Sequence, residues 1–270
     1  MNNSAIGVFD SGIGGLTTVR ALNLLLPNEN IIYLGDTARI PYGTRSRETI
    51  HKYAMQDIAF LERHDVKMII VACGTVSAIM MSNPLSFGDK PSTGVLLPAV
   101  QAACTATRNG RVGVIGTSAT IKSGSYGKAM RSIKPDVNVI GRACPMFVPL
   151  VENGYTSKDC KAARFFAEEY LEVMKTEKVD TLILGCTHYP LLADIITDVL
   201  GDGVTLISPG EEAARYSAAV LSEKELLTDS TENGTNEYYV SDSAQLFTEN
   251  CSAFLGGSMN GKVYECELEV

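Results

Sequence analysis

Short apolar runs recur along the chain and alternate with segments in which apolar residues return every three or four positions. The runs are typical of strands buried on both faces, and the periodic segments are typical of amphipathic helices. The expected strands are 5–10, 31–35, 68–73, 111–116, 138–141 and 181–186, with 204–207 as a further candidate. The expected helices are 17–26, 47–64, 99–108, 157–178 and 191–200. Strands that alternate with helices predict a doubly wound α/β fold.

Two pairs of strand ends resemble each other at a similar spacing. GVFDSGIGG and VGVIGTSAT form one pair, and IIVACGTVSA and LILGCTHYP form the other. This weak repeat predicts two similar doubly wound α/β lobes that face each other, with a site in the cleft between them, because loops at the carboxyl ends of parallel strands carry function. We expect residues 1–97 and 208–270 to form the first lobe and residues 98–207 to form the second.

Composition narrows the class of protein. The chain has 270 residues, of which 45% are hydrophobic and 20% are charged, as in a globular protein with a large core. A net charge of -8 without a block of basic residues disfavours nucleic acid and anionic membranes as partners. The chain opens without a signal-peptide pattern, and its apolar runs are too short to span a bilayer, so we expect a cytoplasmic protein.

The cysteines are odd in number, which disfavours a disulfide framework in a chain without an export signal. The seven are Cys73, Cys104, Cys144, Cys160, Cys186, Cys251 and Cys266. Their spacing does not match a zinc site, so we expect no metal. Most are interpreted as small core residues, but Cys73 and Cys186 occupy matching positions at the ends of apolar strands, each with a threonine within two residues.

These two thiols lie where a strand end meets a probable helix start. Free backbone N–H groups at a helix start lower the pKa of a thiol, which suits it to proton transfer. Two such groups can remove a proton from one face of a carbon and deliver one to the other face, as an amino-acid racemase requires. Because no cofactor-binding loop is evident, we expect no cofactor and a carbanion stabilised by hydrogen-bond donors. The alternative is that each cysteine simply extends the core.

The segment 10–15, DSGIGG, is a second candidate for function. It lacks the Lys-Ser/Thr of a P-loop and the spacing of GxGxxG, so it predicts a tight strand-to-helix turn. Asp10 and Ser11 would offer hydrogen-bonding groups at its tip. His188 is the only histidine beside a candidate cysteine, and the segment 35–43 is either a functional loop or a simple turn.

Several segments together resemble the glutamate racemases of the aspartate/glutamate racemase family. They occur in the family's order between residue 6 and about residue 214, and the tail after Leu221 carries little recognisable pattern. The segments are GVFDSGIGGLTTVRAL, YLGDTARIPYGTRS, VACGTVSA, GVIGTSATIKSGSY, LILGCTHYPLL and ISPGEEAA.

The resemblance implies a role for each matching residue. Cys73 would deprotonate D-glutamate and Cys186 would deprotonate L-glutamate, with Asp10 assisting the first thiol and His188 the second. The residues implied to bind the substrate through side-chain or backbone groups are Asp10, Ser11, Tyr42, Gly43, Gly74, Thr75, Thr187 and His188. The family also implies a cofactor-independent, cytoplasmic, homodimeric isomerase that supplies D-glutamate for peptidoglycan synthesis, and hence for cell wall biogenesis and cell shape.

The chain departs from the family at one site position, where Cys73-Gly74-Thr75 replaces the usual Cys-Asn-Thr. An asparagine at position 74 could bond the substrate and lower KM, or it could clash where the backbone or a neighbour requires glycine. Two other interpretations of the whole chain remain. One is a related two-cysteine isomerase such as an aspartate racemase, and the other is a catalytically silent protein that binds an acidic ligand.

Overall fold

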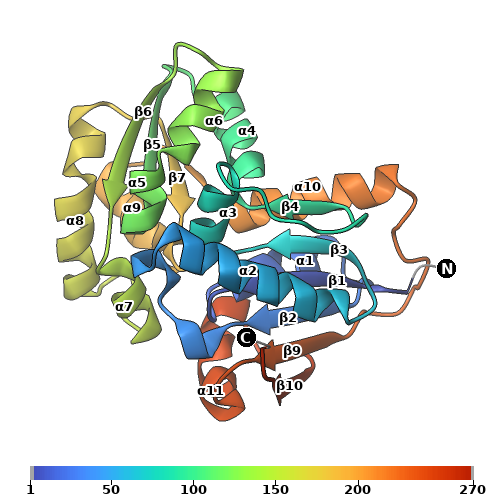
Figure 1. Cartoon of the computed structure of the whole chain (residues 1–270). Coiled ribbons are helices and arrows are strands. Elements are labelled where there is room, and N and C mark those ends of the chain that lie inside the picture. Colours follow the sequence, from blue (N-terminus) through green and yellow to red (C-terminus); the bar gives the residue numbers. More distant parts are fainter. Residues whose placement is uncertain (1–2, 269–270) are drawn as a thin grey trace.

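Two wholly parallel sheets, each packed between helices, make up the computed structural model, which describes residues 3–268 (Figure 1). The first sheet contains, in spatial order, β10 (Lys262–Glu265), β9 (Asn236–Val240), β2 (Ile31–Gly35), β1 (Ala5–Asp10), β3 (Val66–Val71) and β4 (Ser92–Gly94). The second contains β6 (Asn138–Ala143), β5 (Arg111–Gly116), β7 (Thr181–Gly185) and β8 (Thr205–Ile207).

The two sheets share a strand order. In the first sheet β1 lies between β2 and β3 with β4 beyond β3, and in the second β5 lies between β6 and β7 with β8 beyond β7. The prediction of two similar doubly wound lobes is therefore confirmed. The chain then returns to the first sheet, where β9 pairs with β2 and places Tyr238 opposite Tyr33.

Helices cover both faces of each sheet. The α-helices are α1 (Leu16–Leu25), α2 (Arg47–Glu62), α3 (Gly74–Met80), α4 (Leu96–Ala106), α5 (Ser118–Ser123), α6 (Ser125–Ile133), α7 (Phe147–Glu152), α8 (Lys161–Thr176), α9 (Ala193–Leu200), α10 (Pro209–Glu223) and α11 (Ala244–Leu255). The short 3-10 helices among residues 3–268 are η1 (Thr37–Arg39), η2 (Tyr42–Thr44) and η3 (Tyr189–Leu192).

Strand β1 shows why the apolar runs are continuous. Its alternate side chains Ile6 and Val8 belong to the core formed with α1, α10 and α11, whereas Phe9 belongs to the core formed with α2 and α3. A strand covered on both faces has no solvent side on which polar residues would alternate. Burial on both faces therefore explains the continuous apolar run from which this strand was predicted.

Element ends differ from the expectation by a few residues. β3 ends at Val71 and β7 ends at Gly185, so Cys73 and Cys186 lie just beyond the strands rather than closing them. The helix expected at 99–108 already begins at Leu96, since Pro98 is tolerated in a first turn that needs no backbone N–H donor. Within residues 3–268, each helix is too short or too polar to cross a bilayer.

Candidate active site

The predicted functional residues gather at the carboxyl ends of the strands. Asp10 is the last residue of β1, Cys73 follows β3 by two residues, and Cys186 directly follows β7. Thr117 directly follows β5 in the second sheet. Parallel strands bring their carboxyl ends to one edge of a sheet, which is where ligands bind in open α/β folds.

Asp10 organises the turn that leads into α1. Its Oδ2 atom accepts hydrogen bonds from the backbone N–H groups of Gly12, at 3.2 Å, and Gly15, at 3.0 Å. Burial raises the pKa of Asp10, while the charge of His188 and the backbone donors act in the opposite direction. Asp10 therefore fixes the turn and also lies within the electrostatic influence of His188.

Cys73 is almost completely buried, with an exposed fraction of 4%. Its Sγ lies 3.6 Å from Oγ of Ser11. Burial, followed by the negative charge of Asp10, raises the pKa of Cys73 to about 12, although backbone donors at Val76 and Ser11 oppose this. The prediction of a lowered thiol pKa is wrong for Cys73, because burial outweighs the backbone donors. Without a ligand, Cys73 is a neutral thiol.

Cys186 has a cationic neighbour. Its Sγ lies 3.9 Å from Nδ1 of His188, and Nε2 of His188 donates to Oε1 of Glu152 at 2.9 Å. Burial lowers the pKa of His188, but hydrogen bonds and charges from Cys186 and Glu152 outweigh burial and raise it to about 10. A protonated imidazole has two N–H donors, which matches these two contacts. The second thiol thus lies beside a positive charge, unlike the first.

The loop after β1 lies directly against the loop after β7. An ideal Cβ on Gly14 would lie 2.2 Å from Oγ1 of Thr187 and 2.6 Å from Nδ1 of His188, so no side chain fits there. Thr17 Oγ1, in the first turn of α1, donates to the backbone oxygen of Thr187 at 3.2 Å. The Asp10 turn and the Cys186 loop are therefore held together across the two lobes.

Gly74 makes the matching contact beside the other thiol. An ideal Cβ on Gly74 would lie 2.6 Å from the backbone oxygen of Gly185 and 3.8 Å from Cα of Cys186. Backbone cannot give way as a flexible side chain can, so the structure supports the clash and not the gain in affinity for asparagine at this position. A chain with asparagine here needs the two loops farther apart.

Three threonine hydroxyls connect the lobes beside Cys73. Thr75 Oγ1 lies 3.1 Å from Thr117 Oγ1, which lies 3.0 Å from Thr120 Oγ1. An ideal Cβ on Gly43 would lie 3.1 Å from Cβ of Thr117, so the η2 turn lies against this chain of hydroxyls. Hydroxyl groups and backbone amides in this arrangement can bind carboxylate and ammonium groups.

Tyr42 is placed differently from the other predicted binding residues. Its hydroxyl contacts Oδ2 of Asp36 and, at 3.1 Å, Oδ2 of Asp57, and its side chain is buried. The hydroxyl is therefore occupied by protein groups, which leaves the backbone of the 42–44 turn as the part that can meet a ligand.

Two residues of this arrangement were missed from the sequence. Glu152 ends α7, which carries no sequence motif, and only the tertiary fold brings it to His188. Thr117 had a usable signal, because it follows a buried strand and caps α5 by accepting a hydrogen bond from the backbone of Thr120.

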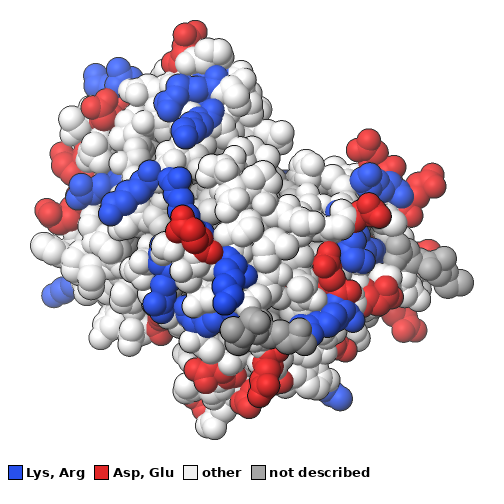
Figure 2. Space-filling view, viewed as in Figure 1, with Lys and Arg blue, Asp and Glu red and all other residues white. Residues whose placement is uncertain are grey.

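Positive charge lies beside the turn that carries Gly43. Figure 2 shows Lys and Arg side chains grouped over α2 and the loop before it, although the chain carries a net charge of -8. Arg45, just after η2, and Arg47, the first residue of α2, are exposed, and Lys122 is exposed on α5, which η2 contacts. A local positive field of this kind favours an acidic small molecule.

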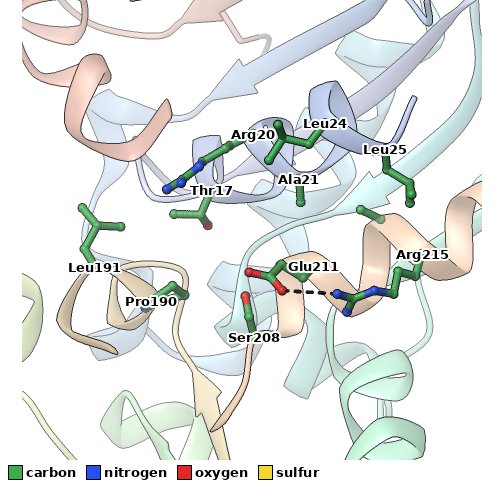
Figure 3. Close-up of a pocket in the computed structure, with 11 residues that line it drawn as sticks. Thr17, Arg20, Ala21, Leu24, Leu25, Pro190, Leu191, Ser208, Glu211 and Arg215 are labelled. Carbon is green, nitrogen blue, oxygen red and sulfur yellow. Dashed lines mark ion pairs between the residues drawn. The ribbon is translucent and has the colours of Figure 1, made fainter. Parts of the chain in front are cut away.

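A separate recess of about 410 Å³ lies between α1 and α10 (Figure 3). Thr17, Arg20 and Pro190 line it, together with an ion pair of 3.5 Å between Arg215 and Glu211. Neither Cys73 nor Cys186 lines it, so it is distinct from the arrangement of the two thiols. Among residues 3–268, no group of three or more His, Cys, Asp and Glu side chains is placed to hold a metal ion.

The fold and the site define a class of protein, a pair of matched α/β lobes in which Cys73 and Cys186 follow equivalent buried strands, β3 and β7. The model of the Asp/Glu/Hydantoin racemase family matches residues 10–217, and the chain belongs to this family. It is 46% identical over 265 residues to the glutamate racemase of Geobacter metallireducens, covering 98% of this chain and 97% of that protein.

Solved structures agree with this assignment. A crystal structure of a glutamate racemase isoform from Bacillus anthracis is similar with a TM-score of 0.91 and 36% identity, covering 98% of both chains. The glutamate racemase of Francisella tularensis, in complex with D-glutamate, is similar with a TM-score of 0.89 and 38% identity, covering 100% of this chain and 99% of that one. The likeness therefore extends over the whole chain.

Proposed function

We propose that this protein is a glutamate racemase, which interconverts L-glutamate and D-glutamate with Cys73 and Cys186 as its two acid/base groups and without a cofactor. One observation carries the proposal. The two thiols follow equivalent strands of the two lobes, β3 and β7, and the glycines beside them, Gly74 and Gly185, are in contact. A substrate carbon between the lobes would have one thiol on each side.

The reaction needs one thiolate and one thiol. In the L to D direction, Cys186 takes the Cα proton as a thiolate beside protonated His188, and the electron pair of the C–H bond stays on the carbon. Cys73, a neutral thiol in the free protein, then delivers its proton to the opposite face. The reverse direction exchanges these roles. Asp10 acts on Cys73, and Glu152 acts on Cys186 through His188.

The substrate's polar groups meet donors from both lobes. Hydroxyl groups of Ser11, Thr75 and Thr187 and the backbone at 42–43 and 74 are the proposed contacts, to which we add Thr117. Donors aimed at the substrate carboxylate stabilise the charge that develops when the Cα proton leaves. The ammonium group of glutamate would also favour a nearby thiolate, which offsets the cost of ionising buried Cys73.

The family supports the wider assignments. We propose a homodimeric cytoplasmic enzyme that supplies D-glutamate for peptidoglycan synthesis, and thus serves cell wall biogenesis and cell shape. We also propose that residues 1–97 and 208–270 form the first lobe and residues 98–207 the second, although the first boundary falls within the first turn of α4. Residues 1–2 and 269–270 lie outside the described residues.

Circular dichroism of each amino acid during incubation tests the function. The optical signal of either glutamate enantiomer should decay to zero in the presence of chelator, and aspartate should react far more slowly. Preferential turnover of aspartate would support the related isomerase, and an unchanged signal with every substrate would support a silent binding protein.

Single substitutions test the two thiols. Cys73→Ser and Cys186→Ser should each remove nearly all racemisation while the protein stays folded, because a serine hydroxyl is too weak an acid. Cys160→Ser, at a partly buried thiol outside the site, is the matched control and should retain activity. Turnover near that of the wild type in either folded site variant contradicts the two-thiol mechanism.

A further inference from the structure

A buried polar cluster supports the turn that carries Gly43. It consists of Asp36, which directly follows β2, Arg39 of η1, Tyr42 of η2 and Asp57 of α2. Asp36 and Asp57 are fully buried, and Tyr42 is 1% exposed. Two acids in such a place must be neutralised or protonated, because an isolated buried carboxylate is very costly.

The donors are divided unequally between the two acids. Asp36 accepts from Arg39 Nε at 2.6 Å and from Ser241 Oγ at 2.8 Å, in addition to its contact with Tyr42. Asp57 Oδ1 accepts a hydrogen bond from Nη2 of Arg39 at 3.1 Å, and its Oδ2 contacts the Tyr42 hydroxyl, also at 3.1 Å. Asp36 therefore has more hydrogen-bond donors around it than Asp57 has.

The contact between Tyr42 and Asp57 then lacks a proton. A phenol has a single O–H, and the Tyr42 hydroxyl contacts both Asp36 and Asp57. If the hydroxyl donates to Asp36, its oxygen faces Oδ2 of Asp57 at 3.1 Å with only lone pairs. Two facing acceptors repel each other, so this contact is favourable only when Asp57 is the donor.

Burial and the two neighbouring acids also favour a protonated Asp57. Burial raises the pKa of Asp57 well above its ordinary value, and the charges of Asp36 and Asp10 raise it further, while Arg39 and the Tyr42 hydroxyl oppose them. The single guanidinium of Arg39 is thus shared by the carboxyl groups of Asp36 and Asp57.

We propose that Asp57 keeps its proton at neutral pH and donates it to Tyr42, which donates to Asp36, so that this relay holds the 42–44 turn against Thr117 and the cleft. Asp57 is then a positioning residue that acts through Tyr42 on the backbone of Gly43. This inference rests on the proposed function, because the turn matters for turnover only if it binds the substrate.

Asparagine is the informative substitution, because its amide copies a protonated carboxyl group. In Asp57→Asn, Nδ2 can donate to Tyr42 while Oδ1 accepts from Arg39, and neither contact depends on pH. The wild type should lose affinity as the pH rises and Asp57 ionises, since the Tyr42 contact becomes repulsive. The variant should not show this additional loss.

The experiment compares KM and kcat of the wild type and the Asp57→Asn, Asp57→Ala and Glu62→Gln variants between about pH 6 and about pH 10. Glu62 is exposed at the end of α2 and is the matched control. We expect Asp57→Asn to stay within about threefold of the wild-type KM at neutral pH and Asp57→Ala to raise KM about tenfold or more. The ratio of wild-type KM to Asp57→Asn KM should rise at alkaline pH. Because both proteins meet the same substrate, ionisation of the substrate itself cancels in this ratio.

Thermal unfolding gives a readout that does not depend on activity. A proton held in the folded state but not in the unfolded state contributes stability that is lost as the pH rises from the unfolded pKa of about 4 towards the raised folded pKa. The Tm of Asp57→Asn minus the Tm of the wild type should therefore increase as the pH rises.

Opposite results overturn the inference. An Asp57→Asn protein that fails to fold, or that raises KM as much as Asp57→Ala does, means that Asp57 acts as the ionised partner of Arg39. A flat ratio of KM values across the pH range also contradicts the relay. Failure of the proposed function is distinguishable, because the wild type would then racemise nothing while the shift in Tm persisted.

Discussion

Glu152 Oε1 lies 2.9 Å from Nε2 of His188, whose other ring nitrogen faces Cys186. The carboxylate at the end of α7 therefore helps to decide whether the group beside the second thiol is an imidazole or an imidazolium. This connects a residue on the rim of the second lobe with the proton chemistry of the cleft.

Glu152→Gln should move the alkaline limb of the kcat profile to lower pH. The amide keeps an acceptor oxygen but removes the negative charge, so the pKa of His188 falls from about 10. If this pKa falls by about one, the protonated fraction falls about twofold near the new pKa and about tenfold above the original pKa. A pH series of initial rates measures the shift. Glu169→Gln, at an exposed position on α8, should leave the profile unchanged, and an unmoved alkaline limb in Glu152→Gln would contradict this role.

Gly14→Ala should reduce kcat strongly. The added Cβ would lie 2.2 Å from Oγ1 of Thr187 and would push the Asp10 turn away from His188, and the φ angle of Gly14 is not left-handed, so the clash alone is tested. We expect a loss of about a hundredfold, as for a displacement of about 1 Å at a reacting centre. Gly12→Ala is the control in the same turn, because its nearest neighbour is a flexible Ile40 methyl group at 3.3 Å. Equal rates for the two variants would show that the contact between the loops is unimportant.

Gly74→Asn and Gly74→Ala should both impair the enzyme. Either Cβ meets the backbone oxygen of Gly185 at 2.6 Å, so the amide cannot improve KM before the two loops have separated. Steady-state kinetics and Tm measure the effect, and the alanine variant separates the clash from the chemistry of the amide. Gly203→Ala, in open space, is the control. A lower KM in Gly74→Asn than in the wild type would restore the hypothesis that the chain merely lacks a substrate contact.

Asp180→Asn should lower stability in a manner that depends on pH. Burial acts to raise the pKa of Asp180, but hydrogen bonds from Thr107, Asn109 and Arg108 outweigh burial and lower it. The stability is therefore present above the unfolded pKa of about 4 and is lost as the pH falls through the lower folded pKa. We expect a loss of about 2 kcal/mol at neutral pH, which is a fall of several degrees in Tm.

Differential scanning calorimetry in acidic and neutral buffers tests this prediction. The difference in Tm between Asp180→Asn and the wild type should shrink in acid. Asp202→Asn, at an exposed loop position, should give no such difference at any pH. A deficit that is constant with pH would mean that the carboxylate charge of Asp180 contributes nothing.

Much of the fold could be predicted because local patterns reflect burial. Ile6, Val8 and Phe9 are all apolar because both faces of β1 are covered, and such runs recur at the other central strands. The tail could not be predicted in this way. In β9, buried Tyr238 and Val240 alternate with partly exposed residues, and the pairing partner β2 is distant in the sequence, so no local pattern reveals it.

Some features of the site could likewise be predicted from local sequence, and others could not. Cys73 and Cys186 could be singled out as candidates because their signal, a thiol after a buried strand, is local. Glu152 and the contact of Gly74 with Gly185 arise only from the packing of the two lobes. The resemblance implied that Tyr42 binds the substrate through its side chain or backbone, whereas the fold directs its hydroxyl to two buried acids.

The return of β9 to β2 has a consequence for biosynthesis. Asn30 and Thr235, which bond to each other beside this pairing, are 205 residues apart, so β2 has no partner on that side until nearly the whole chain has left the ribosome. During translation the second sheet is complete first, while the first presents an open edge of the kind that promotes aggregation. A nascent chain stalled before Asn236 is therefore the species that we expect chaperones to protect.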